Sequence, residues 1–358
     1  MRYVLTIVMR AISLLSGGLD SSLATKMVLD QGIEVVALKF TSPFCNCDSG
    51  GTCHAAKIAH ELGIEMINVA KGEEYLEVVK NPKHGRGSEM NPCIDCRIYM
   101  LRKAKVIADQ IDAQFLFTGE VLGQRPMSQH RKALELIDRA TGLQGKLLRP
   151  LSAKLFPPTE AEKMGWVDRE KLLAISGRSR KEQMELAEEN GIADYPCPAG
   201  GCLLTFKEFS AKLRDHLLHH PERLTMRDIA LLKVGRHFRV NGHKVIIGRD
   251  ERENQILKTL VNGEMDVLEP TEVKGPVCLV EGHDRETVTE AAAMLARYFD
   301  GGPLPIRVEI IGTGREITEV VPATNVKIDS WRIGIGENIM AIDGTQPFLV
   351  IGQKGSDF

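Results

Sequence analysis

The residues best suited to chemistry begin with a short polar loop, Ser16-Gly17-Gly18-Leu19-Asp20-Ser21. An apolar run precedes this loop and apolar residues at helical spacing follow it, so it should join a strand to a helix. At that position, free backbone N–H groups and the helix dipole favour phosphate oxygens, and the two glycines let the backbone close on an anion. The loop lacks the Gly-Lys-Ser/Thr ending of a Walker motif, so no lysine need hold a transferring γ-phosphate. A serine-rich turn without a ligand is the alternative.

Four cysteines form a second candidate site. Cys93 and Cys96 should open a helix, whose N-terminus stabilises thiolates, and their spacing lets both sulfurs reach one ion or cluster. Cys202, with Cys197 nearby, lies in a Gly/Pro loop much later in the chain. Three cysteine ligands would leave an iron–sulfur cluster with one iron open to an exogenous sulfide. A redox pair that carries a persulfide would use the same residues differently, and buried, unreactive thiols are the third alternative.

A third constellation consists of Cys45, Cys47 and Cys53, with His54 adjacent. Cysteine and histidine at this density in a loop are typical of structural Zn²⁺, although the spacing matches no standard zinc motif. A zinc site and the absence of any metal therefore both remain open.

Two further loops carry polar residues that suit anions. Residues 117–126 follow an expected strand, where Gly119 would permit close approach to a nucleotide and Arg125 and Gln129 could contact phosphate or RNA. The second loop is a compact basic turn suited to phosphates, made of Arg178, Ser179, Arg180 and Lys181. Either stretch could instead be an ordinary surface loop.

Alternating strands and helices should position these residues. The pattern predicts strands at 12–15, 33–40, 65–69 and 114–118, separated by helices at 20–29, 55–62 and 96–111. Such alternation predicts an α/β fold with a doubly wound parallel sheet, which binds ligands at the carboxyl ends of its strands.

A change of pattern indicates a second domain. Helices are predicted at 169–175 and 180–190, and beyond about residue 215 short β-like runs follow at 243–247, 277–280 and 306–311, with a helix at 286–299. We therefore expect a first domain over 1–215, which carries the phosphate-type loop, and a smaller α+β domain over 221–358.

Composition narrows the class of protein. With 358 residues, 43% hydrophobic and 26% charged, the chain is typical of a globular protein of two or three domains. A net charge of −2 excludes binding to nucleic acid through bulk charge, but basic stretches at 123–154 and 212–239 permit an RNA partner without requiring one. Eight cysteines without an apolar span or export signal indicate a soluble protein of the reducing cytoplasm, with no membrane partner.

Four motifs together carry a family resemblance: SGGLDS, NPCIDC, FTGEVLGQRPMSQH and PCPAGGCLLT. They resemble the tRNA thiolation branch of the PP-loop ATPases, akin to 4-thiouridine synthetases and 2-thiouridylases, from residue 12 to about residue 205. The resemblance implies that Ser16, Gly17, Gly18 and Ser21 bind pyrophosphate and that Asp20 helps to hold Mg²⁺. It also implies that Phe40 lies near the adenine, although plain core packing of Phe40 is equally open.

The resemblance also implies an activity. In those families ATP adenylylates a uridine carbonyl oxygen of tRNA, and sulfur from sulfide or a persulfide carrier then displaces AMP. A second resemblance lies in residues 248–254 with Gly275-Pro276, which are similar to an RNA-binding domain of the NFACT-R type. It implies that the second domain binds RNA, and a homodimer is left open.

These observations lead to one main hypothesis and two alternatives. The main hypothesis is a tRNA uridine thiolase in which Asp20, Cys93, Cys96 and Cys202 are catalytic. The first alternative keeps the adenylylation and uses ammonia or an amine in place of sulfur. The second is a non-catalytic RNA-binding or iron–sulfur sensing protein that retains the nucleotide loop.

Overall fold

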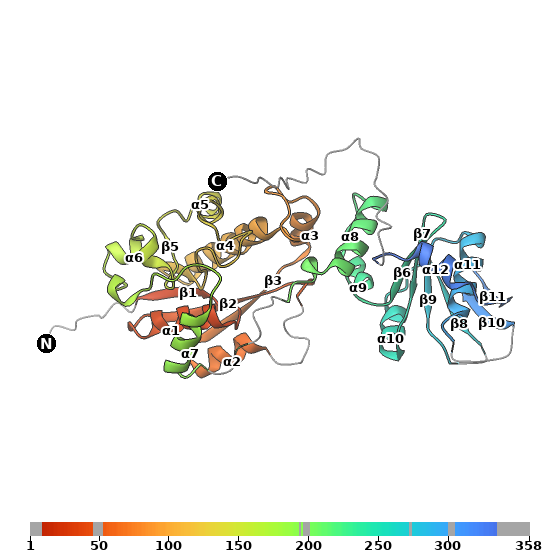
Figure 1. Cartoon of the computed structure of the whole chain (residues 1–358), viewed down its shortest axis with the longest axis horizontal. Helices are drawn as coiled ribbons and strands as arrows, with labels where there is room; N and C mark the ends of the chain where they lie inside the picture. The colour runs from red at the N-terminus through yellow and green to blue at the C-terminus, as the bar shows by residue number, and fades with distance from the viewer. Residues whose placement is uncertain are drawn as a thin grey trace. The chain divides into compact units, whose positions relative to one another are not determined.

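The chain forms two compact units, Met1–Leu203 and Leu204–Phe358, called here the first unit and the second unit (Figure 1). The computed structural model describes residues 9–45, 53–192, 195, 201–271, 274–299 and 305–334. Among the described residues, no helix combines the length and the apolar character that crossing a bilayer requires.

The first unit is built on a five-stranded sheet in the order β3-β2-β1-β4-β5, and every neighbouring pair is parallel. The predicted doubly wound α/β fold is confirmed. The strand order reverses at β1, so the crevice that binds ligands in such sheets should open at the carboxyl ends of β1 and β4. The strands are β1 (Arg10–Leu14), β2 (Glu34–Thr41), β3 (Glu65–Ala70), β4 (Phe115–Thr118) and β5 (Leu147–Leu148).

Helices cover both faces of this sheet, because neighbouring strand residues point to opposite sides. Ala11 of β1 packs in one apolar cluster, and Ile12 packs in another on the other side. The first cluster takes residues from α1 (Leu19–Leu29), α2 (His54–Glu61) and α7 (Lys181–Glu189). The second takes residues from α4 (Cys93–Gln110) and α5 (Arg131–Thr141). Figure 1 shows the two helical layers with the sheet between them.

The remaining elements of the first unit are short, except for α3, which contacts α4. They are α3 (Glu73–Lys80), α6 (Glu160–Lys163) and the 3₁₀ turns η1 (Ala153–Leu155) and η2 (Arg169–Lys171). The predicted helix at 169–175 is wrong beyond η2. There the backbone of Leu173 donates to Pro150 and that of Ile175 donates to Leu151, so the segment is extended and pairs with residues 150–154.

The second unit contains a six-stranded antiparallel sheet in the order β11-β10-β8-β9-β7-β6, with helices, as the predicted α+β class requires. The strands are β6 (Arg236–Val240), β7 (His243–Ile247), β8 (Met265–Pro270), β9 (Cys278–Glu281), β10 (Ile306–Ile311) and β11 (Arg315–Val320). The helical elements are η3 (Leu203–Thr205), which crosses the division, α8 (Lys207–His219), α9 (Met226–Lys233), α10 (Glu251–Thr259), α11 (Arg285–Ala296) and α12 (Asn325–Trp331).

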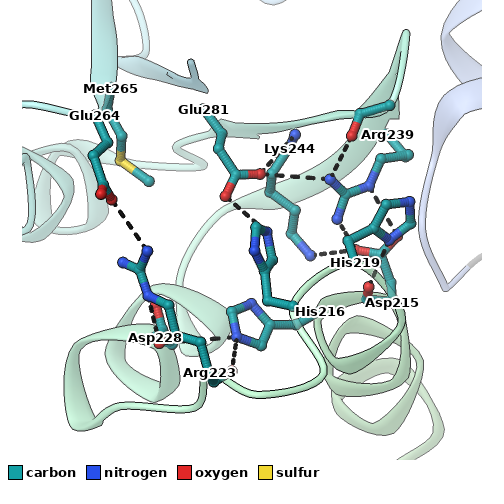
Figure 2. A network of polar contacts seen from close by, with 12 residues as sticks. Asp215, His216, His219, Arg223, Asp228, Arg239, Lys244, Glu264, Met265 and Glu281 are labelled. Carbon is teal, nitrogen blue, oxygen red and sulfur yellow. Dashed lines mark hydrogen bonds and ion pairs between the residues drawn. The ribbon is translucent and has the colours of Figure 1, made fainter.

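The division between the units falls after Leu203, before the predicted boundary at 215–221, because α8 belongs to the second unit. Asp215 on α8 accepts hydrogen bonds from Arg239 at 3.1 and 2.6 Å and from Lys244 at 2.6 Å. Nearby, the His220 ring lies 2.9 Å from a carboxylate oxygen of Glu281 on β9. Figure 2 shows this network between the helix and the strands. Its partly buried charges fix α8 on the sheet of the second unit.

Candidate functional site

The loop between β1 and α1 is closed by hydrogen bonds among its own serines. The Ser21 hydroxyl donates to the carbonyl of Gly18 at 2.9 Å and accepts from the backbone N–H of Ser16 at 3.2 Å. The Ser16 hydroxyl accepts from the N–H of Gly18 at 3.3 Å. The N-cap Gly18 makes no side-chain cap, so the first N–H groups of α1 are available to an anion.

Two glycines allow backbone segments to meet at this loop. Gly17 has a φ of +78°, and a Cβ there would lie 2.5 Å from the backbone nitrogen of Ala55, at the start of α2. Gly119 follows β4, and a Cβ there would lie 2.5 Å from backbone atoms of Asp20 and Ser21. The close approach predicted for Gly119 is therefore an approach to the loop backbone, and the ends of β1, β4 and the start of α2 converge on it.

Asp20 presents its two carboxylate oxygens to different surroundings. Oδ2 accepts from the side chain of Gln124 at 2.8 Å and lies 3.3 Å from the guanidinium of Arg180. Oδ1 is buried and has no hydrogen-bond partner among the described residues. A buried carboxylate oxygen without a partner is costly, so it fits an oxygen ligand for a hard cation such as Mg²⁺.

Arg180 lies beside this carboxylate, and Arg125 lies within electrostatic range of Asp20, Arg180 and Arg97. Although the side chain of Arg125 is exposed, desolvation by its neighbours, and then Arg97 and Arg180, lower the pKa of Arg125, while Asp20 and Cys93 act in the opposite direction. Arg125 therefore shares one neighbourhood with these groups. A concentration of guanidinium groups beside a phosphate-type loop suits a polyanionic ligand.

Buried Glu120, next to Gly119, ties the arginines to the fold. It lies 3.4 Å from Arg97 and 3.1 Å from Arg149, and Arg149 also binds Asp138 at 2.7 Å. Burial alone would raise the pKa of Glu120, but Arg97 and Arg149 reverse this effect and hold the pKa below its usual range. Glu120 is therefore an anion that holds Arg97 beside the site.

The cysteines of α4 lie at the start of that helix, as predicted, in contact with α3 and its preceding residues. Lys71, which is buried, donates to the sulfur of Cys96 at 3.0 Å and lies 4.5 Å from the ring centroid of Tyr75. Burial, and then Cys96, raise the pKa of Tyr75, and Cys202 and Cys93 act in the same direction. Three of the predicted cysteines thus lie within electrostatic range of one tyrosine.

This neighbourhood does not form a metal site as it stands. Within the described part of the chain, no group of three His, Cys, Asp or Glu side chains is arranged to hold a metal ion. Burial, and then Cys96, raise the pKa of Cys93, which works against the thiolate predicted at this helix start. Three thiols are suitable ligands for an iron–sulfur cluster. In this structure, however, the described cysteines are not arranged to bind one together. Cys197 lies outside the described residues.

The two described cysteines of the predicted zinc constellation have different neighbours. Cys45 forms a backbone bridge with Cys202, so it lies on the side of the other cysteine group. Cys53 is the N-cap of α2, and its sulfur lies 3.5 Å from the ammonium of Lys39. Cys47 lies outside the described residues. Cys45 and Cys53 therefore give no support to a shared zinc site.

The remaining predicted site residues divide into two groups. Phe40 packs against the cluster under α4, as the core alternative expects, and Gln129 accepts from the backbone of Arg125 at 3.1 Å. Of the residues predicted to bind RNA, Arg180 lies 3.3 Å from Asp20, whereas Arg125, Arg178 and Lys181 are exposed.

Sequence reasoning missed several residues of the site. These are Gln124, Arg97, Lys71, Tyr75 and Glu120. Gln124 and Glu120 lie in the stretch that follows β4, so their position in the sequence could have identified them as site residues. Lys71 follows β3 in the same way, because polar residues directly after parallel strands meet at one edge of the sheet.

In the second unit, the loop predicted to resemble an RNA-binding motif has a structural role. A Cβ on Gly248 would lie 2.1 Å from the side-chain oxygen of Asn254, and that oxygen accepts from the N–H of Val277 at 3.0 Å. Arg249 forms an ion pair with Glu253. The motif thus fixes the start of α10 against the residue that directly precedes β9.

Two family models match the chain. Residues 7–154 match the family described as thiamine biosynthesis protein (ThiI), and residues 235–332 match the family described as NFACT protein RNA binding domain. Both predicted resemblances are confirmed, one in each unit.

The curated relatives match part of their length. A tRNA-specific 2-thiouridylase MnmA of Idiomarina loihiensis is 26% identical over 226 residues, which cover 58% of this chain and 56% of the relative. A probable tRNA sulfurtransferase of Finegoldia magna is 33% identical over 150 residues, which cover 40% of this chain and 36% of the relative. The chain thus spans about half, or less, of the length of these relatives. A crystal structure of a 4-thiouridine synthetase–RNA complex with bound ATP is 24% identical over 51% of each chain, with a TM-score of 0.33.

Proposed function

We propose that this chain is an ATP-dependent tRNA sulfurtransferase, which adenylylates a uridine carbonyl oxygen and replaces that oxygen by sulfur, giving 4-thiouridine or 2-thiouridine. One observation carries the proposal: at the phosphate-type loop, packed against Gly119 at the end of β4, Asp20 holds a buried Oδ1 that has no hydrogen-bond partner among the described residues. The match of residues 7–154 to the ThiI family and the sulfurtransferase relatives support it.

In this proposal ATP and Mg²⁺ bind at the loop. The first N–H groups of α1 and the serines of the loop would hold the β and γ phosphates, and Asp20 Oδ1 would be a ligand of the cation. Bound Mg²⁺ supplies charge neutralisation on the pyrophosphate that leaves. The guanidinium groups of Arg125 and Arg180 would stabilise the remaining negative charge.

The first chemical step would make the uridine oxygen a leaving group. The carbonyl oxygen attacks the α-phosphorus, a new O–P bond forms, the α–β P–O bond breaks, and pyrophosphate departs. The N3 proton of the base is lost to solvent. A sulfur nucleophile then adds to the ring carbon, the C–O bond breaks, and AMP leaves with its electron pair. When the nucleophile is a persulfide, the thiolate of a second cysteine then attacks the inner sulfur, so that the S–S bond breaks, a disulfide forms and the thiolated base is released. A carbonyl oxygen leaves readily only after such esterification.

The sulfur would be delivered in the neighbourhood of Cys93, Cys96 and Cys202. The source of the sulfur is either sulfide held on an iron–sulfur cluster or a persulfide carrier. Only the first requires the purified protein to contain iron. Iron and absorbance measurements on anaerobically purified protein and its Cys93→Ala variant decide between them. A colourless, iron-free preparation assigns the step to a persulfide. The RNA partner would be held by the second unit, which the match of residues 235–332 supports.

The test of the proposed function is turnover with unmodified tRNA, ATP, Mg²⁺ and a sulfide source. We expect AMP, pyrophosphate and thiolated uridine from the wild type. Asp20→Asn should lose AMP formation, whereas Cys96→Ala should lose thiolation. Formation of ADP and orthophosphate would overturn the proposal. A Cys96→Ala variant that still modifies uridine would point to an amine or ammonia as the nucleophile.

A further inference from the structure

The carboxylate of Asp20 is held from one side only. Oδ2 accepts from Gln124 at 2.8 Å and from Arg180 at 3.3 Å, while the buried Oδ1 has no partner among the described residues. A carboxylate held by one oxygen cannot rotate freely about its terminal bond, so its other oxygen keeps a fixed direction. The groups that bind Oδ2 therefore decide where Oδ1 points.

The two amides behind Oδ2 form a chain with a defined direction. A carboxylate only accepts, so the group of Gln124 that faces Asp20 must be its NH₂. The oxygen of Gln124 then faces Gln183, which must in turn donate, and it does so at 3.3 Å. Hydrogen bonds thus run from Gln183 to Gln124 to Asp20.

Gln183 is placed for this role and poorly placed for a purely structural one. It lies on α7 and is fully buried, with 0% of its surface exposed. Its side-chain oxygen has no hydrogen-bond partner in the described part of the chain. A buried amide with an unsatisfied oxygen destabilises a fold relative to an apolar side chain of similar shape. Stability alone therefore does not explain the residue.

We infer that Gln124 and Gln183 are positioning residues that aim Oδ1 of Asp20 at the metal ion of a bound metal–nucleotide complex. The inference rests on the proposed role of Asp20 as a ligand of the cation. It gives α7 a part in nucleotide binding, because α7 supplies Gln183 directly behind Gln124 and supplies Arg180, its N-cap residue, at Oδ2.

The test measures binding of the Mn²⁺ complex of α,β-methylene ATP by water proton relaxation, together with the thermal midpoint of each variant. The variants are Gln124→Met and Gln183→Met, with Asp20→Asn as the test of the ligand itself. Gln31→Met is the matched control, because Gln31 lies at the other end of α1 and bonds to the backbone of Asp168.

We expect Gln124→Met and Gln183→Met each to weaken binding by about 10-fold, the lower end of the effect of groups that orient a metal ligand. The thermal midpoint of Gln183→Met should stay at or above that of the wild type, and Gln31→Met should bind normally. If Gln183→Met fails to fold, Gln124→Met carries the test alone.

Two other outcomes separate the inference from the proposed function. Wild-type affinity in Gln124→Met and Gln183→Met, with weak binding in Asp20→Asn, overturns the positioning role and leaves the proposed function intact. Wild-type affinity in Asp20→Asn overturns the role of Asp20 in the proposed function.

Discussion

Single residues decide how closely the segments of the site approach one another. Gly119 is the clearest case, because the backbone of the loop occupies the space that a side chain would need. Glu120, its neighbour, is the anion that holds both Arg97 and Arg149. Gly119 therefore sets the distance between the end of β4 and the loop, and Glu120 holds the positive charge of Arg97 beside the loop.

Replacement of Gly119 by alanine tests whether the close approach of β4 to the loop is needed for AMP formation, because it adds bulk and removes no functional group. A Cβ 2.5 Å from backbone atoms forces the loop to move, so we expect Gly119→Ala to lower AMP formation by at least about 100-fold, as misplacement by about 1 Å does. Gly263→Ala is the control, because a Cβ there meets nothing within 4 Å. Wild-type AMP formation in Gly119→Ala would contradict this packing.

Removal of the charge of Glu120 should destabilise the first unit. Glu120→Gln leaves the buried Arg149 with Asp138 alone, and breaking a buried pair costs about 3 kcal/mol or more. Urea unfolding measures this loss. The exposed pair of Arg10 and Glu34 is the comparison, and Glu34→Gln should cost less than about 1 kcal/mol. Equal losses of unfolding free energy in Glu120→Gln and Glu34→Gln would contradict a stabilising role of the buried ion pair.

The sequence predicted the residues that follow strands in recognisable motifs. The loop at Ser16–Ser21, Gly119 and the start of α4 at Cys93 were all placed where the structure has them. It did not predict that Arg180 lies at Asp20, 160 residues away, because no local pattern records which distant turn reaches a given carboxylate.

At the scale of secondary structure elements, α8 shows how buried charges hold a helix on a sheet. Asp215 joins it to β6 and β7 through Arg239 and Lys244. Lys212, one turn earlier, donates to the carbonyls of Leu232 and Gly235 at 3.5 and 3.2 Å. Burial, and then Arg249 and Lys244, lower the pKa of Lys212 to about 8.

The low pKa of Lys212 predicts a dependence of stability on alkaline pH. In the unfolded chain this lysine has a pKa of 10.5, so between about pH 8 and 10.5 the unfolded state binds more protons and stability of the second unit rises with pH. The rise is at most about 3 kcal/mol. Lys212→Met should remove this rise in urea unfolding, whereas Lys258→Met, at a partly exposed ion pair, should keep it. If the stability of Lys212→Met rose with pH as steeply as that of the wild type, the pH dependence could not be assigned to Lys212.

The elements that sequence reasoning misjudged depend on distant partners. Residues 169–175 contain buried Leu172 and Ile175 at a helix-like spacing, yet the backbone of Leu173 and Ile175 pairs with residues 150–154. Such pairing is a tertiary interaction that overrides local propensity. Similarly, the predicted boundary at 215–221 followed the change in composition, whereas the ion pairs of Asp215 place α8 with the second unit.

At the scale of the whole molecule, two separate cores predict two unfolding transitions. Calorimetry of the full chain should resolve them, and Glu120→Gln should lower only the transition of the first unit. Mg²⁺ with α,β-methylene ATP should raise the midpoint temperature of that same transition. The corresponding stabilisation is about 2.7 kcal/mol at a ligand concentration of a hundred times Kd. A single transition, or a ligand effect on the other one, would contradict this assignment.

The backbone bridge between Cys45 and Cys202 has a consequence for how the chain continues. Together with the hydrogen bond from the Leu203 N–H to the Phe44 carbonyl at 2.8 Å, it pins the last residues of the first unit beside the end of β2. The covalent tether to the second unit therefore starts at the edge that carries the thiols. If the second unit binds RNA, as proposed, this anchoring point contributes to the effective concentration of that RNA at the first unit.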